Sequence, residues 1–192
     1  MILKHSFFMA AAAAALALAA GNMKAADPET GDASAYCEAN GGKVIVREPV
    51  YNTNGPESSW LVLTGKRKFC QFTSKKDGSR IHVLLQTLWA TTPTLAALAY
   101  YAKETPNSPG PGNPASYYCT QLGGTDLFGG PTAAGGGWVG KGSEDAVLEA
   151  CIFPDMSTID SWGLTYNANG IIRGIDLTTV LRYAPPSGAA AH

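Results

Sequence analysis

The strings SAYCEANGG (residues 34–42) and SYYCTQLGG (residues 116–124) match in their serine, tyrosine, cysteine and paired glycines, at an offset of 82 residues. Further matches follow at nearly the same offset: Cys70 and Phe72 with Cys151 and Phe153, Leu95 with Leu177, and Tyr101 with Tyr183. Among these matches, only the second cysteine and its neighbour shift by one residue. Self-similarity at a fixed period predicts an internal duplication.

The composition bounds the class of protein. The chain has 192 residues, 45% of them apolar and 15% charged, which suits one domain or two small ones with a buried core. A formal net charge of −1 argues against a generally basic nucleic-acid-binding protein, so we expect no nucleic-acid partner. Four cysteines and three histidines leave little material for metal or nucleophile chemistry.

The first 26 residues are typical of a secretory signal. Lys4 precedes an apolar stretch over residues 6–20, and small residues follow it. This stretch is shorter than the ~20 residues that span a bilayer, which favours a cleaved signal over a retained anchor. Because Gly21 is followed by Asn22 and not by a cysteine, we expect a non-lipidated protein that is periplasmic or secreted. An even number of cysteines in an oxidising compartment predicts two disulfides.

Proline and glycine mark the boundary between the copies. Residues 105–113 are rich in both, so they cannot continue a helix or a central strand. The expected layout is a signal peptide (1–26), an N-terminal lead (27–33), module 1 (34–104), a linker (105–113), module 2 (114–184) and a flexible tail (185–192).

Each module is expected to be a small α+β unit with a short helix, an antiparallel sheet and a closing helix. Asn113 and Pro114 suit the start of the opening helix of module 2, and the paired glycines end both opening helices. The Asn169-Gly170 pair predicts a hairpin turn within residues 162–175. Alternating apolar residues predict strands at 43–50, 59–65, 68–72 and 147–153, and helical spacing predicts closing helices at 94–104 and 176–184.

The duplication also implies a pairing of the cysteines. Four cysteines allow three connectivities, and spacing alone does not choose among them. The repeat favours Cys37–Cys70 and Cys119–Cys151, one disulfide in each module. No CxxC pair is present, so both disulfides are expected to be structural.

Module 2 carries a recognisable pattern. The strings NPASYYCTQLGG (residues 113–124) and CIFPDMSTIDSW (residues 151–162) resemble a small bacterial extracytoplasmic domain family of unknown function that is labelled hemolysin. The family pattern is NPAS-x-YC-x-x-x-GG, followed by C-x-FPDG-x-x-C-x-x-W. The resemblance is strong in module 2 and weak in module 1. It implies an exported module without an established activity.

The sequence departs from this pattern in several places. Met156 replaces the turn glycine of FPDG, and Ile159 stands where the family often has another cysteine. The usual terminal cysteine is also missing, so one family disulfide is expected to be lost as a pair. Module 1 lacks both the FPDG string and the tryptophan.

Few residues are candidates for catalysis. His82 is the only histidine outside the signal and the tail, and its alternating neighbours favour a strand residue over a general base. Acidic pairs at 155/160 and 144/145 could serve a glycosidase, but capped turns and a solvated loop are the simpler interpretation. The glycine-rich segment 135–143 lacks the Gly-Lys-Ser/Thr of a phosphate loop. We expect no enzyme, no metal site and no cofactor.

The two modules carry opposite charge. Residues 34–105 hold nine basic and five acidic side chains, whereas residues 113–192 hold three basic and seven acidic ones. Electrostatic docking of the two copies is one interpretation. The other is a surface for an anionic membrane or another acidic partner. That surface would be formed by Lys66, Arg67, Lys68, Lys75, Lys76 and Arg80.

These patterns favour a non-enzymatic exported module that binds a protein or a cell-envelope component. One alternative is a secreted or periplasmic protease inhibitor that presents the loop at residues 51–58. Another is a membrane-active protein that uses the uncharged segment between Arg80 and Lys103. Pro93 and several threonines in that segment favour a core strand and helix instead.

Overall fold

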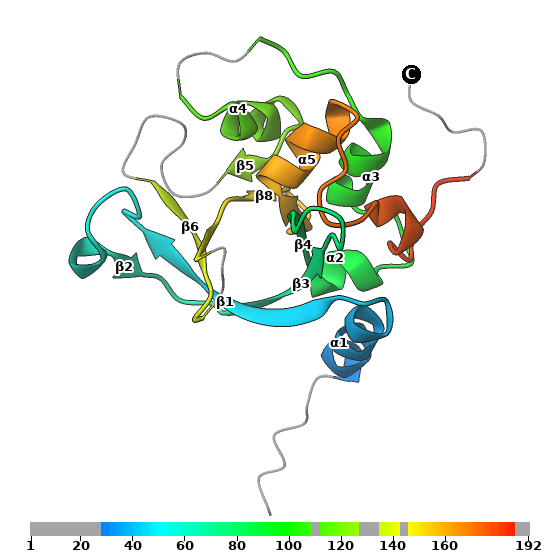
Figure 1. The fold of residues 1–192 in the computed structure, drawn as a ribbon, viewed down its shortest axis with the longest axis horizontal. Helices are drawn as coiled ribbons and strands as arrows, with labels where there is room; N and C mark the ends of the chain where they lie inside the picture. Colours follow the sequence, from blue (N-terminus) through cyan, green and yellow to red (C-terminus); the bar gives the residue numbers. More distant parts are fainter. Residues whose placement is uncertain (1–27, 109–111, 127–134, 143–145, 187–192) are drawn as a thin grey trace, which may run out of the picture.

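The computed structural model describes residues 28–108, 112–126, 135–142 and 146–186. The expected signal peptide and residues 187–192 of the expected tail lie outside these ranges. In chain order the elements are α1 (Pro28–Ala39), β1 (Lys43–Tyr51), η1 (Glu57–Ser59), β2 (Leu61–Val62), β3 (Arg67–Thr73), β4 (Arg80–Leu84), α2 (Leu85–Trp89), α3 (Leu95–Ala102), α4 (Pro114–Gln121), β5 (Thr125–Asp126), β6 (Gly136–Val139), β7 (Val147–Leu148), β8 (Ala150–Ile152), β9 (Thr158–Asp160), α5 (Ser161–Ala168) and η3 (Leu177–Thr179) (Figure 1).

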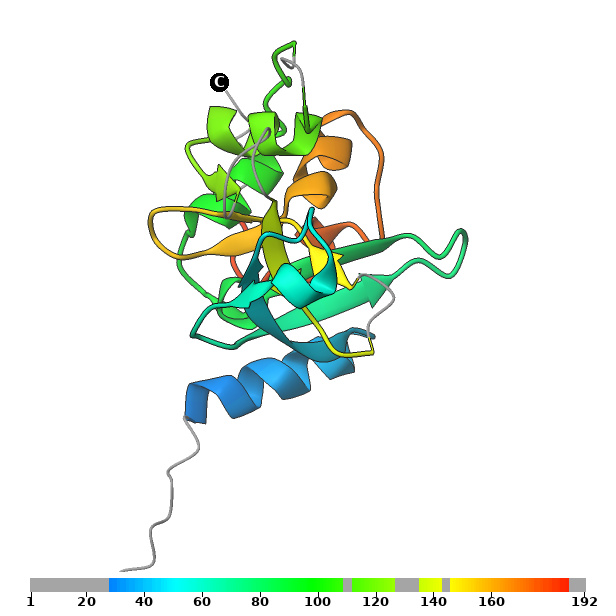
Figure 2. The ribbon, with the colours of Figure 1, turned by 90° about the vertical axis from the view of Figure 1, so that its left-hand side faces the viewer.

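A curled antiparallel sheet forms the centre of the molecule. Its strand order is β5-β8-β9-β4-β3-β1-β6-β7, and β2 pairs with β1. Helix α1 lies at one end of the molecule and α3, α4 and α5 gather at the other (Figures 1 and 2). The class is therefore α+β, as predicted. Strands β4 and β9 meet at Val83 and Ile159, so residues from both expected modules share one sheet.

Each disulfide ties a helix to a strand of the same half. Cys37 of α1 is bonded to Cys70 of β3, and Cys119 of α4 is bonded to Cys151 of β8. This confirms the predicted pairing. The first helix of each half is thereby held against the sheet, and both disulfides lie in the main hydrophobic core.

The paired glycines after each helix serve two different purposes. Gly41 and Gly123 both have φ +80°, the left-handed conformation in which glycine ends a helix without strain. Gly42 and Gly124 face the disulfides instead. A Cβ atom on either of them would overlap the sulfur atoms of its own half. The same two requirements therefore recur in both halves.

A tight turn follows the second cysteine of each half. In the second half, Asp155 accepts hydrogen bonds from the N–H and hydroxyl groups of Ser157, and Met156 between them has φ +66°. Module 1 lacks the FPDG string, yet Asp77 and Ser79 make the same two bonds. The intervening Gly78 has φ +71°. Hydrogen bonds from Ser79 lower the pKa of Asp77 to about 2.

Each of these turns accepts hydrogen bonds from backbone N–H groups in the closing segment of the other half. The Oγ atom of Ser157 accepts from the N–H of Ala96 at 2.9 Å, and Asp155 accepts from the N–H of Leu95 at 2.8 Å. Conversely, Oγ of Ser79 accepts from the N–H of Gly174 at 3.1 Å. Burial raises the pKa of Asp155, but hydrogen bonds from Ser157 and Leu95 outweigh it and hold the pKa below its usual value.

Two tyrosines of the opening helices also make hydrogen bonds to the other half. The hydroxyl of Tyr36 in α1 donates to the carbonyl of Val180 at 2.8 Å, near the end of the second half. The hydroxyl of Tyr118 in α4 donates to the carbonyl of Glu104 at 2.7 Å, at the end of the first half. Each half is thus closed by the final segment of the other.

Two sequence predictions for the second half are wrong. The prediction of a hairpin at residues 162–175 is wrong, because α5 occupies residues 162–168 of this segment, with Asp160 capping its first turn. The Asn169-Gly170 pair ends this helix, and Gly170 has φ +75°. The expected closing helix at 176–184 is reduced to η3, because the β-branched run from Thr178 to Val180 disfavours helix.

We expect Met156→Gly to stabilise the protein by about 1 kcal/mol, because a non-glycine residue pays for the left-handed conformation. The methionine side chain is exposed, so little packing is lost with it. Urea unfolding of Met156→Gly and Met156→Ala measures the effect. Alanine keeps the backbone penalty, and an equal gain in both variants would show that side-chain removal is responsible.

Candidate functional site

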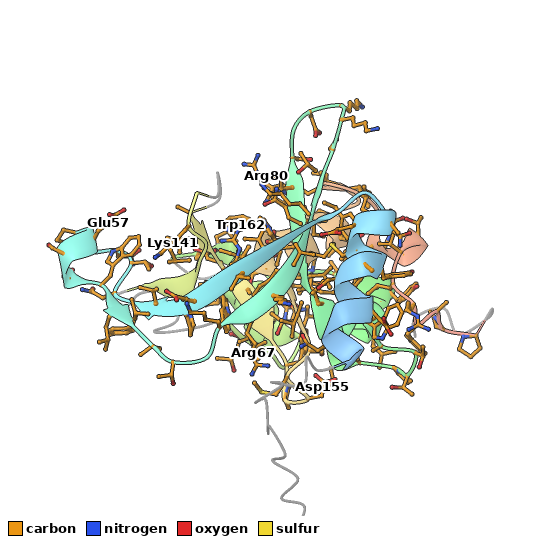
Figure 3. All side chains as sticks on the ribbon, turned by 90° about the horizontal axis from the view of Figure 1, so that it is seen from below. Glu57, Arg67, Arg80, Lys141, Asp155 and Trp162 are labelled. Carbon is orange, nitrogen blue, oxygen red and sulfur yellow. A yellow bond between two sulfur atoms is a disulfide. The ribbon has the colours of Figure 1, made fainter. Side chains whose placement is uncertain are left out.

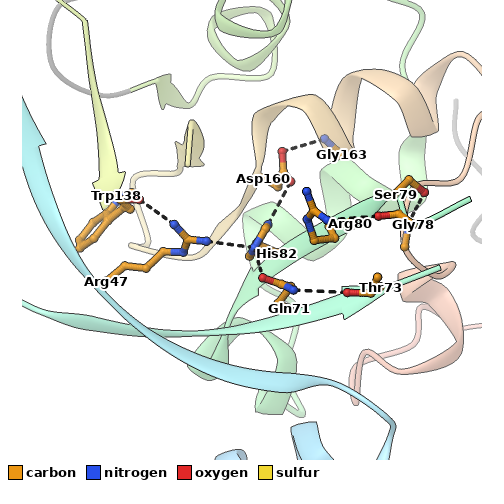
Figure 4. Close-up of polar contacts among 11 residues, drawn as sticks. Arg47, Gln71, Thr73, Gly78, Ser79, Arg80, His82, Trp138, Asp160 and Gly163 are labelled. Carbon is orange, nitrogen blue, oxygen red and sulfur yellow. Dashed lines mark hydrogen bonds and ion pairs between the residues drawn. The ribbon is translucent and has the colours of Figure 1, made fainter. Parts of the chain in front are cut away.

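Buried polar side chains from three strands meet inside the curled sheet (Figure 4). Arg47 of β1 places Nη2 3.2 Å from Nε2 of His82 in β4, and His82 Nδ1 lies 3.4 Å from Oδ2 of Asp160 in β9. Arg47 also donates from Nη1 to the carbonyl of Trp138 at 2.9 Å. Arg47, His82 and Asp160 are 0%, 1% and 4% exposed. These contacts connect the strands of both halves.

The surroundings of His82 do not suit a general base. Both ring nitrogens face polar groups: Nε2 lies beside the guanidinium of Arg47, and Nδ1 faces the carboxylate of Asp160. Nε2 also lies 3.1 Å from Oε1 of Gln71. The second oxygen of Asp160 accepts from the N–H of Gly163 at 3.0 Å and so caps α5. A substrate would have to displace these partners before it reached the imidazole.

A hollow of about 400 Å³, here called the polar pocket, opens beside this network. Ser116 of α4 donates to the carboxylate of Asp126 in β5, and Asn113 donates to Glu149 at 2.6 Å. The lining consists of Thr53, Asn54, His82, Asn113, Ser116, Asp126, Gly135, Gly136, Val147, Leu148, Glu149, Asp160, Trp162 and Arg173. Within the described ranges, no group of three or more His, Cys, Asp or Glu side chains is arranged to hold a metal ion.

Sequence reasoning missed the polar pocket because its residues come from distant parts of the chain. One signal was present. Asp126 pairs with Cys151 as Val44 pairs with Cys70, so a carboxylate stands where the first half has a valine. A comparison of the two copies position by position would have found it.

The basic residues predicted to form one surface are spread along the β3–β4 hairpin. Arg67 begins β3, whereas Arg80 pairs with Thr73 at its other end, and the two lie far apart in Figure 3. Lys75 and Lys76 occupy the turn between the strands. Lys66 and Lys68 lie at the Arg67 end.

Lys66 contributes to a second hollow of about 820 Å³, here called the valine–lysine groove. Its Nζ lies 2.6 Å from Oε1 of Glu48. The hydrogen bond and charge of Lys66 lower the pKa of Glu48. The lining consists of Lys43, Val44, Ile45, Val46, Glu48, Val50, Trp60, Val62, Lys66, Gln71, Val139, Lys141 and Gly142.

The other candidate segments have structural partners. Asp155 holds the start of α3 and Asp160 caps α5, whereas residues 144 and 145 lie outside the described ranges. Within the loop at 51–58, Trp60 donates from its indole to the carbonyl of Gly55 at 2.9 Å, and η1 begins at Glu57. The glycine-rich segment contributes β6, and its residue 143 is outside the described part.

The uncharged segment between Arg80 and Lys103 forms β4, α2 and α3. Leu85, Leu88 and Tyr100 from this segment belong to the main core. Burial raises the pKa of Tyr100 to about 12. No helix in the described part of the chain is both long enough and apolar enough to span a bilayer.

Comparison with known proteins returned no matching protein family, no matching curated protein and no matching solved structure.

Proposed function

We propose that the chain is an exported, non-enzymatic binding module whose valine–lysine groove takes an anionic amphiphile of the cell envelope. This ligand would be an acyl chain with an acidic head group. The observation that carries the proposal is an uncovered apolar strip on β1 and β2, bordered by lysines. The engaged ring nitrogens of His82 support a role without catalysis.

The floor of the groove is apolar and is accessible at Val46 and Val62, whereas Val50 is buried. Alternation along β1 directs Val44, Val46 and Val50 to one face, and Val62 of β2 pairs beside Val50. Helix α1 lies over one end of β1 only, and the end that carries β2 has no helix over it in Figure 3. Val46 and Val62 are 50% and 58% exposed. Contiguous exposed apolar surface of this kind marks binding sites in water-exposed proteins.

The border of the groove is basic. Lys43, Lys66 and Lys141 line it against one carboxylate, that of Glu48. Glu48 is already paired with Lys66, which leaves positive charge in excess. Long lysine stems extend the apolar floor while their ammonium groups face water. An acyl chain on the valines with an acidic head group beside the lysines would satisfy both features.

We further propose that the chain consists of two copies of one unit, related to the extracytoplasmic family that module 2 resembles. Matching features in the two halves support this: a helix tied by a disulfide to a strand, a left-handed glycine, a second glycine against the disulfide, and an Asp-x-Ser turn. Two disulfides are typical of proteins outside the reducing cytosol, which supports export to the periplasm or beyond.

Binding of the oxidised protein to vesicles of phosphatidylglycerol, vesicles of phosphatidylcholine and dissolved dodecanoate tests the groove. We expect affinity for the two anionic probes that weakens with salt. The double variant Lys43→Glu/Lys141→Glu should lose at least about tenfold in affinity. The matched control Lys75→Glu/Lys76→Glu changes the same charge at the tip of the hairpin and should bind normally.

The other outcomes of this experiment assign the role elsewhere. A loss confined to the control variant would place binding at the hairpin tip and overturn the groove. Equal affinity for phosphatidylcholine would remove the acidic head group from the proposal. Release of a trapped dye from the vesicles would favour the membrane-active alternative. Binding of dodecanoate without vesicle binding would identify a free amphiphile as the ligand.

A further inference from the structure

We propose that the polar pocket is a second ligand site and that it binds an oligosaccharide. It shares no lining residue with the valine–lysine groove and does not depend on the ligand of that groove, although its comparison of the two halves rests on the proposed duplication. The argument rests on which polar groups the fold does not require, on the chemistry they present, and on the space beyond them.

The two halves show which polar groups the fold can do without. Asp160 pairs with Ala150, the residue before a disulfide cysteine, and Leu84 pairs with Phe69 in the corresponding position of the first half. The first half has Leu84 and Val44 at the positions of Asp160 and Asp126, so the strand pairing alone does not require carboxylates there, although Asp160 also caps α5. Burying such groups costs free energy unless partners satisfy them.

Asp126 and Ser116 are only 7% and 6% exposed, yet both line the pocket. Carboxylates accept hydrogen bonds, whereas Asn113 and Arg173 can donate them. A mixed wall of planar acceptors and donors suits adjacent hydroxyl groups, because each sugar hydroxyl both donates and accepts. A simple cation would interact with the carboxylates of this wall but not with its donors.

Trp162 provides the apolar element of the site. Its ring is partly exposed on α5 and lies 5.9 Å from the ring of Tyr166. An indole presents a flat apolar face with a polar edge, which matches a sugar ring whose C–H groups lie on one face and whose hydroxyls lie at the rim. Arg173 lies above Tyr166, 5.4 Å from the ring centre, on the same side of the pocket.

A further hollow adjoins the polar pocket beyond Trp162. Trp162 and Arg173 also line a hollow of about 540 Å³ that includes Asp77, Tyr166 and Ile171. Ile171 and Tyr166 are exposed there. Two adjoining hollows that share Trp162 and Arg173 accommodate a chain of sugars better than a single one. We therefore expect a trisaccharide to bind more tightly than its monosaccharide.

Titration of the oxidised full chain, followed through the indole NMR signal of Trp162, tests the site. The probes are chitotriose, maltotriose and cellotriose at up to about 10 mM, each beside its own monosaccharide. At least one trisaccharide should shift the Trp162 signal and bind about tenfold or more tightly than its monosaccharide. Glu149→Gln, whose amide oxygen can still accept from Asn113, should weaken that binding about tenfold.

Controls separate the pocket from the groove and from charge alone. Trp162→Ala, followed by titration calorimetry because it lacks the indole signal, should abolish binding, and Lys141→Glu should leave it unchanged. The proposal is overturned if no trisaccharide shifts the signal while the protein remains folded. It is equally overturned if binding survives in Glu149→Gln and Trp162→Ala, or if spermidine but no trisaccharide shifts the signal.

Discussion

Replacing Cys119 and Cys151 together by alanine is expected to lower the free energy of unfolding by about 3.5–4 kcal/mol. The two cysteines are 32 residues apart, and opening a loop of that length restores conformational freedom to the unfolded chain. Both sulfurs are also buried in the main core, so packing is lost as well. Urea unfolding under non-reducing conditions measures the effect as a shift in midpoint.

Gly124 provides a control for the folded state. A Cβ atom at this position would overlap Cys151 Sγ, so Gly124→Ala should destabilise the oxidised protein by about 2 kcal/mol or more. The same substitution should cost much less once both cysteines are alanine. This non-additivity is measured by a double-mutant cycle. Equal penalties in both backgrounds would contradict the packing of the disulfide against the glycine.

Replacing Arg47 by methionine is expected to lower the free energy of unfolding by about 3–5 kcal/mol. The guanidinium is fully buried and donates to the Trp138 carbonyl, while it also faces His82. Its removal leaves the buried carboxylate of Asp160 with less positive charge nearby. Chemical unfolding of the wild type and the variant at the same pH measures the loss.

Two further variants identify the cause of that loss. Arg47→Lys keeps the charge but cannot reach both Trp138 and His82 with the same geometry, so it should be intermediate. Combining Arg47→Met with Asp160→Asn removes both charges and should cost less than the sum of the single changes. A neutral or stabilising Arg47→Met would show that apolar packing can replace the network.

The sequence predicted the fold class and the disulfides because both depend on local strings that occur twice. The offsets between corresponding cysteines differ by only one residue. Each string specifies its helix and its glycines within nine residues. The prediction of a hairpin turn at the Asn169-Gly170 pair is wrong for a physical reason. A left-handed residue serves a hairpin turn and the end of a helix equally well, and the buried face of α5 decided between them.

The equivalent of the Asp155 turn in module 1 escaped notice because extra residues separate Phe72 from Asp77. The candidate sites were harder still. The valine–lysine groove combines β1, β2 and β6, and the polar pocket combines residues from positions 53 to 173. The groove depends on the pairing of β1 with β6 and the pocket on the pairing of β4 with β9, and no local pattern specifies either contact.

Each half of the molecule is hydrogen-bonded to the closing segment of the other half. The Ser79 turn is hydrogen-bonded to Gly174, and the Ser157 turn is hydrogen-bonded to Ala96. Neither half can therefore unfold without breaking hydrogen bonds to the other half. Unfolding should therefore be a single cooperative event. A backbone break between the halves would leave two fragments that these contacts hold together. The protein should therefore remain active after proteolytic cleavage of its linker.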